Sequence, residues 1–77
     1  MTIISLKGDR PRISSSCFVS KSAIVIGKVS IGADSSLWPG CVIRGDEAEI
    51  RIGKRVNVQD NCVIHADRAH PVRIGDV

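Results

Sequence analysis

The most regular feature of this sequence is a branched aliphatic residue at every sixth position. From residue 13 the repeat runs without a gap through Ile13, Val19, Val25, Ile31, Leu37 and Ile43. It then stalls for three residues, resumes at Ile52, Val58 and Ile64, and after a second stall returns at Ile74. A step of six residues advances an α-helix by about 240° and would scatter these side chains around it. The spacing therefore excludes an amphipathic helix.

The fifth position of each hexad outside the two stalls is also small or branched. It is occupied by Cys17, Ala23, Val29, Ser35, Cys41, Val56 and Cys62. Positions one and five have the same parity, so along a strand their side chains point to the same side. Gly27, Pro39 and Gly45 stand between them, where the chain can bend. Each hexad is therefore predicted to form a short strand and a corner, with two residues facing inward.

Three such hexads make a triangular coil of eighteen residues, and successive coils stack about 4.8 Å apart through parallel ladders. We predict an all-β fold, a parallel β-helix of about three and a half coils over residues 13–77, with residues 1–12 as a leading strand or cap. The last hexad breaks off at Val77, so the solenoid is expected to be incomplete there. The predicted columns are Ile13, Ile31, Ile52 and Ile74; Val19, Leu37 and Val58; and Val25, Ile43 and Ile64.

Both stalls fall at the same corner of the predicted coils, and polar residues gather around them. In this register Arg44 stacks against His65, and Asp46 aligns with Asp67. The face before this corner carries the NVQD segment. Such a cluster is compatible with a functional site, and equally with a solvated corner whose arginine and aspartate only pair.

Composition narrows the range of partners. The 77 residues include 11 Lys/Arg and 8 Asp/Glu, a net charge of +3, spread along the chain without a block of like charge. The only aromatic residues are one Trp and one Phe. Nucleic-acid binding usually needs clustered basic residues, often with aromatics that stack on bases. We therefore expect no nucleic-acid partner.

The cysteines and the N-terminus bear on the compartment. Cys17, Cys41 and Cys62 show no CxxC or other metal-ligand spacing, and we expect small core residues with free thiols. The segment MTIISLKGDRPR lacks a basic start with a long apolar run, and no stretch reaches the ~20 apolar residues of a membrane span. A reducing, cytoplasmic location without membrane contact is the resulting expectation.

One long segment resembles a known family. The run SLWPGCVIRGDEAEIRIGKRVNVQDNCVIHAD, followed by HPVRIGD, is similar to the amino-terminal half of the γ-class carbonic anhydrase-like family. Its members are left-handed β-helices of hexapeptide repeats. A hexad repeat alone is shared with many acyltransferases, but RGD, NVQD and IHAD at these separations are more specific. The resemblance implies the left hand, a homotrimer built through β-helix faces, and reversible hydration of carbon dioxide to bicarbonate.

The resemblance also assigns roles to residues of the site. His65 matches the first metal-binding histidine. Gln59 matches the residue that hydrogen-bonds the metal-bound hydroxide or the substrate, and Glu47 stands where some members have a glutamate for proton handling. Arg44 matches an arginine that pairs with an aspartate, here Asp60, near the subunit interface.

Two further points complete the implied site. Asp46 matches an acid of the same interface network. The family binds zinc or iron through three histidines, and the second and third occur in a later coil that this sequence does not reach. His70, the only other histidine, is expected to be an exposed loop residue. The resemblance thus implies a metal-dependent enzyme in the full-length form and no activity from these residues alone.

Two other functions stay open. A hexapeptide acyltransferase would bind coenzyme A between subunits and use a histidine as general base. A non-enzymatic assembly or binding module is the second alternative, favoured by the two missing histidines. Metal content per trimer would separate this module from an enzyme.

Overall fold

The six-residue repeat becomes a stack of short parallel strands. The computed structural model describes all 77 residues and contains strands and turns but no helix. The strands are β1 (Thr2–Ile4), β2 (Arg12–Ile13), β3 (Phe18–Val19), β4 (Ile24–Ile31), β5 (Ser36–Leu37), β6 (Val42–Ile52), β7 (Asn57–Val58), β8 (Val63–His65) and β9 (Val72–Ile74). All strand pairs are parallel, which confirms the predicted fold class.

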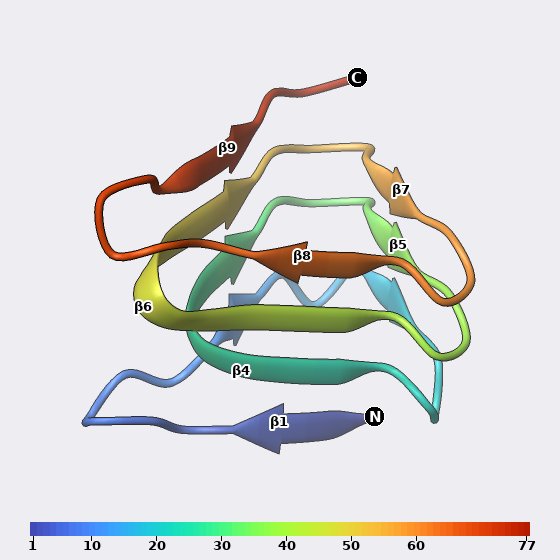
Figure 1. Cartoon of the computed structure of the whole chain (residues 1–77). Coiled ribbons are helices and arrows are strands. Elements are labelled where there is room, and N and C mark those ends of the chain that lie inside the picture. The colour runs from blue at the N-terminus through green and yellow to red at the C-terminus, as the bar shows by residue number, and fades with distance from the viewer.

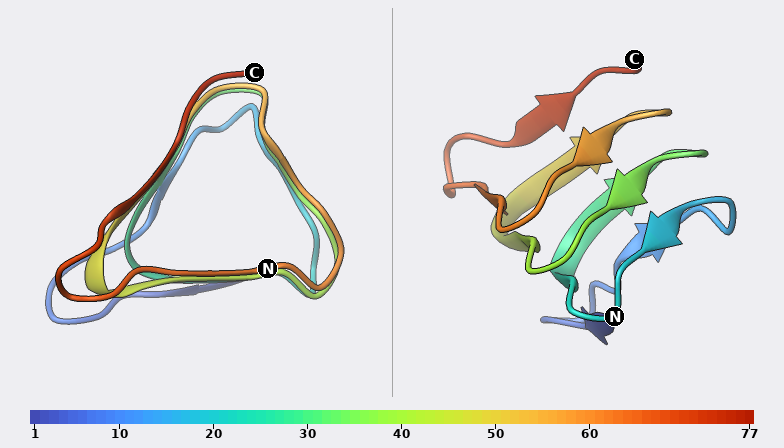
Figure 2. Two further views of the ribbon diagram at one scale, coloured as in Figure 1. Left: turned by 45° about the horizontal axis from the view of Figure 1, so that its top comes forward. Right: turned by 90° about the vertical axis from the view of Figure 1, so that its right-hand side faces the viewer.

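Three flat faces enclose the core of the solenoid. One face is formed by β1, β8 and the first parts of β4 and β6, and a second by β2, β9 and the last parts of β4 and β6. The third is the sheet β3-β5-β7. We call these the first, second and third faces. Seen from the carboxyl-terminal end, the chain runs clockwise as it rises toward the viewer (Figure 2, left), so the coils are left-handed.

The predicted columns are the observed register. Ile13 pairs with Ile31, Ile31 with Ile52 and Ile52 with Ile74. The other two columns follow the same rule, with Val19, Leu37 and Val58 on the third face and Val25, Ile43 and Ile64 on the first. Ile3 of β1 lies under Val25. The leading segment therefore adds a rung to the first column.

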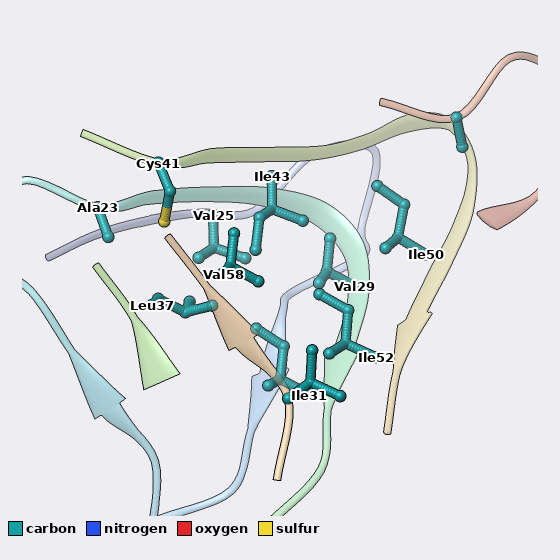
Figure 3. Packing of buried hydrophobic residues seen from close by; sticks show 12 residues of the cluster. Ala23, Val25, Val29, Ile31, Leu37, Cys41, Ile43, Ile50, Ile52 and Val58 are labelled. Atoms are coloured by element: carbon teal, nitrogen blue, oxygen red, sulfur yellow. The ribbon is translucent and has the colours of Figure 1, made fainter. Parts of the chain in front are cut away.

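Inward-facing aliphatic residues form the core along the axis of the solenoid (Figure 3). Leu37, Ile43 and Ile50 are fully buried. Ser35 is buried among them because its hydroxyl donates to the Gly53 carbonyl at 2.9 Å and accepts from the Val56 amide at 3.1 Å. A polar group is thus tolerated in the core because both its donor and its acceptor are satisfied.

One expectation about the core is wrong. Cys41 is buried and Cys17 is half-buried, but Cys62 is exposed. It belongs to the inward series, yet it lies at the carboxyl-terminal end of the stack, where no further rung covers it. Burial raises the pKa of the Cys41 thiol, with a contribution from the neighbouring Cys62. All three thiols are free, as predicted.

A modest core truncation tests the importance of the columns. We expect Ile43→Val to destabilise the protein by about 1 kcal/mol, because it removes one methyl group from a fully buried site. Ile13→Val, in a half-buried position near the amino-terminal end of the stack, should cost less. Equilibrium urea unfolding of the full-length variants measures both. Equal costs would show that Ile43 does not lie in a closed core.

The corner between the first and second faces is where the repeat stalls. β4 and β6 run continuously through it, whereas separate strands and a corner were expected for each hexad. The register shifts from Gly27↔Gly45 to Val29↔Ile50, so β6 has three more residues than β4 at the bend. In the next coil, residues 66–71 form a loop at the same corner (Figure 1). The predicted placement of both stalls is confirmed.

The sequence prediction missed a third excursion at this corner. Residues 5–11 connect β1 to β2 there, and both this loop and the later one close with an isolated antiparallel bridge, Leu6↔Asp9 and Asp67↔His70. Ile3 and Ile13 are separated by the same number of residues as Ile64 and Ile74. That spacing was the available signal for an additional coil.

Candidate functional site

The stalled corner brings together charged residues from two coils. Strand β6 supplies Arg44, Asp46 and Glu47, and β8 ends at His65. Arg44 and His65 are register partners, as the sequence predicted. Alternation along β6 directs Ile43 into the core, so its neighbour Arg44 faces outward. The site therefore lies on the outer surface of the solenoid, where the chain bends.

Asp46 links the imidazole to the guanidinium. Its Oδ1 lies 3.0 Å from His65 Nε2, and its Oδ2 lies 3.4 Å from Arg44 Nη1. Glu47 Oε2 is 3.8 Å from the same imidazole nitrogen. The side chains of His65 and Asp46 are 31% and 26% exposed. The imidazole is thus held by a carboxylate yet remains accessible.

The electrostatics favour an ionised Asp46. Desolvation acts to raise the pKa of this carboxyl, but the backbone hydrogen bond, the hydrogen bond with His65 and the charges of His65 and Arg44 together lower it. Its pKa is consequently below the usual value for aspartate. An ionised carboxylate can orient the imidazole and keep one ring nitrogen in a hydrogen bond.

Two of the predicted site residues lie elsewhere in the chain. Gln59 and Asp60 follow β7, at the corner between the third and first faces, and both are exposed. The length of β8 separates them from His65 (Figure 1). The prediction that all the polar residues converge on one corner is therefore wrong within a single chain. The NVQD segment ends at one corner of the coil, and the IHAD segment lies at the next corner.

Within the chain, Arg44 does not form the ion pair with Asp60 that the resemblance implied. Arg44 contacts Asp46, while Asp60 has no ion pair. A contact between Arg44 and Asp60 of another copy stays a prediction. Asp67 faces no residue of β6 in the register, because its backbone pairs with His70 in the loop. His70 is exposed, as predicted.

The donor atoms of this chain do not by themselves fit a zinc or iron centre. No group of three His, Cys, Asp or Glu side chains is placed to hold a metal ion. His65 offers one imidazole, whose Nε2 is already hydrogen-bonded to Asp46. A catalytic zinc requires about three protein ligands and an open position. The corner supplies one candidate ligand and its supporting carboxylate.

The fold and repeat define the class: this is a left-handed parallel β-helix of hexapeptide repeats. No family model matches the chain. It is 40% identical over 81 residues to mitochondrial gamma carbonic anhydrase 1 of Arabidopsis thaliana, covering 97% of the chain and 30% of that protein. It is 42% identical over 74 residues to the carbonic anhydrase of Geobacillus kaustophilus, covering 96% of the chain and 41% of that protein.

The resemblance to γ-class carbonic anhydrases is thereby confirmed at the level of sequence. Among solved structures, a hexapeptide transferase family protein from Anaplasma phagocytophilum matches with a TM-score of 0.92 and 36% identity, covering 97% of the chain and 43% of that protein. The chain spans 30% and 41% of the two curated relatives. The similarity therefore concerns one part of each relative.

Proposed function

We propose that the full-length protein is a γ-carbonic anhydrase-like enzyme that reversibly hydrates carbon dioxide at a site between subunits. The observation that carries this proposal is the imidazole of His65, held by Asp46 at 3.0 Å, on a chain 40% and 42% identical to γ-type and bacterial carbonic anhydrases over nearly its whole length. A zinc or iron ion is the proposed cofactor. His65 would be one ligand, and the others would come from outside these 77 residues.

The other polar residues have proposed roles that follow from their positions. Asp46 orients the imidazole, and the exposed Glu47 beside it is a candidate for moving protons to solvent. Gln59 would position the substrate or its hydroxide through its amide. Because it lies one corner away from His65 in the same chain, Gln59 would act at the His65 of a neighbouring copy.

We propose a homotrimer in which the first face lies at the interface. Its outward positions include aliphatic side chains, with Val63 66% exposed and Ile4 40% exposed. Arg44 and His65 border this surface in the same strands. Exposed aliphatic surface rimmed by polar groups is typical of association sites. A cytoplasmic location is proposed because all three thiols are free; no helix of the chain could span a bilayer.

Arg44→Ala tests the assembly role. In the full-length protein we expect the variant to shift the equilibrium from trimer toward monomer, because it leaves a carboxylate at the interface without its partner. Sedimentation velocity at matched concentrations measures the change. Arg73→Ala, on the second face, is the control and should leave the trimer intact. If the trimer is equally stable in both variants, the ion pair of Arg44 does not contribute to assembly and is only a surface contact.

The 77-residue chain by itself should have no carbon dioxide hydration activity and should self-associate. One histidine ligand is too few for a catalytic metal. The backbone of β7, β8 and β9 has no strand on its outer side, and such edges pair with other chains. Light scattering and a hydration assay with added zinc check both parts. A soluble monomer, or zinc-dependent turnover above background, would contradict the prediction.

The similarity to a hexapeptide transferase family protein supports the second candidate, an acyltransferase that uses coenzyme A. An assembly or binding module without catalysis is the third. Assaying the full-length protein in parallel for carbon dioxide hydration and for acetyl-coenzyme A consumption tests the proposal. Hydration without acetyl transfer is expected. Acetyl transfer alone would favour the acyltransferase. Absence of both activities would favour the non-catalytic module.

A further inference from the structure

A small cavity lies beside the stalled corner, on the amino-terminal side. Its lining residues come from the loop between β1 and β2, from β2, from the bend of β4 and from β6; Figure 1 shows where these segments lie. Its volume is about 200 Å³. The lining residues are Gly8, Asp9, Arg10, Arg12, Lys28, Val29, Ser30 and Glu49. None of these residues belongs to the candidate hydration site.

Three cationic residues without ion-pair partners line this cavity. Arg10, Arg12 and Lys28 are exposed, and none of them takes part in an ion pair. Strands β2 and β4 place Arg12 directly opposite Ser30, which is also a lining residue. These charges look dispersed in the sequence. In the folded chain all three line the same cavity beside the corner.

The two carboxylates of the lining differ in their availability. Glu49 Oε1 is bound by Arg51 Nε at 3.0 Å, so its charge is already compensated. Asp9 has no ion pair, although three cations line the same cavity. The lining therefore contains three unpaired cationic residues, a serine and one carboxylate without an ion pair, around a space larger than a small anion.

We propose that this cavity binds a small oxyanion of the phosphate class. Guanidinium groups match the oxygen atoms of phosphate through charge-assisted hydrogen bonds, and Lys28 adds a point charge. Asp9 would accept the hydrogen bond of the protonated phosphate oxygen. An anion without such a proton, such as sulfate, should bind more weakly. The proposal does not depend on the hydration activity.

Titration of inorganic phosphate into the full-length protein tests this site. The protein is first treated with a chelator, so that no metal centre competes for the anion, and binding is followed by calorimetry. We expect saturable binding at one site per chain. Arg10→Gln and Lys28→Gln should each weaken it by about tenfold, as expected for loss of a charge-assisted hydrogen bond. Arg73→Gln, on the second face and outside the cavity, should bind like the wild type.

Two further comparisons complete the test. Sulfate should bind less tightly than phosphate to the wild type, and Asp9→Asn should reduce that difference. Circular dichroism confirms that each variant keeps its strand content. Absence of saturable binding by the folded wild type would overturn the proposal. Equal weakening by Arg10→Gln and Arg73→Gln would also overturn it, because it would indicate attraction to the overall positive charge.

Discussion

Replacing Gly27 by alanine is expected to destabilise the solenoid by about 4 kcal/mol. Gly27 has φ of +77°, where a Cβ costs roughly 1–2 kcal/mol. A Cβ at this position would also lie 2.5 Å from the Gly45 carbonyl oxygen of the next coil. That oxygen belongs to the backbone of a buried residue, so relief requires the coils to separate, and overpacking adds about 1–3 kcal/mol.

Another glycine supplies a matched control for Gly27→Ala. Gly8 has φ of +84° but open space around its Cβ position, so Gly8→Ala should show the backbone cost alone. Thermal or urea unfolding of the full-length variants gives the two values. Equal losses for Gly27→Ala and Gly8→Ala would show that the coils can move apart at no cost.

The columns of the core could be predicted because the position of each aliphatic residue in the six-residue repeat assigns it to one face and one coil. A fixed step of six between Ile13 and Ile43 sets which side chains stack, and the register follows without knowledge of any side-chain conformation. The corner at Gly45 could be located for the same reason. Extra residues between two regular stretches have no partners in the neighbouring coil, so they must lie at a bend between the paired strands. Pairing of Arg44 with His65 followed from that register.

Contacts made by long side chains could not be predicted in this way. Asp46 was expected beside Asp67, but it turns toward His65 and Arg44, a choice set by distances across the bend. The cavity shared by Arg10 and Lys28 was missed because the first coil was taken as a cap. Exposure of Cys62 depends on what covers the last rung, which an inward-facing position alone does not reveal.

His65→Ala in the full-length protein is expected to reduce carbon dioxide hydration by more than about 100-fold. Residues that only support a metal ligand typically contribute 10- to 100-fold, and we propose that His65 is itself a ligand. His65 is 31% exposed in its side chain and lies outside the core, so its removal should leave the unfolding midpoint of the metal-free protein nearly unchanged. Bound metal per subunit should fall together with the activity.

Stopped-flow measurement of carbon dioxide hydration by the full-length wild type, His65→Ala and His70→Ala tests the proposed function most directly. Both histidines lie near the same corner, but only His65 contacts Asp46. The proposal predicts rapid hydration by the wild type and by His70→Ala and near-background rates for a folded, trimeric His65→Ala. Background rates for the metal-loaded wild type, or equal rates for wild type and His65→Ala, would contradict it.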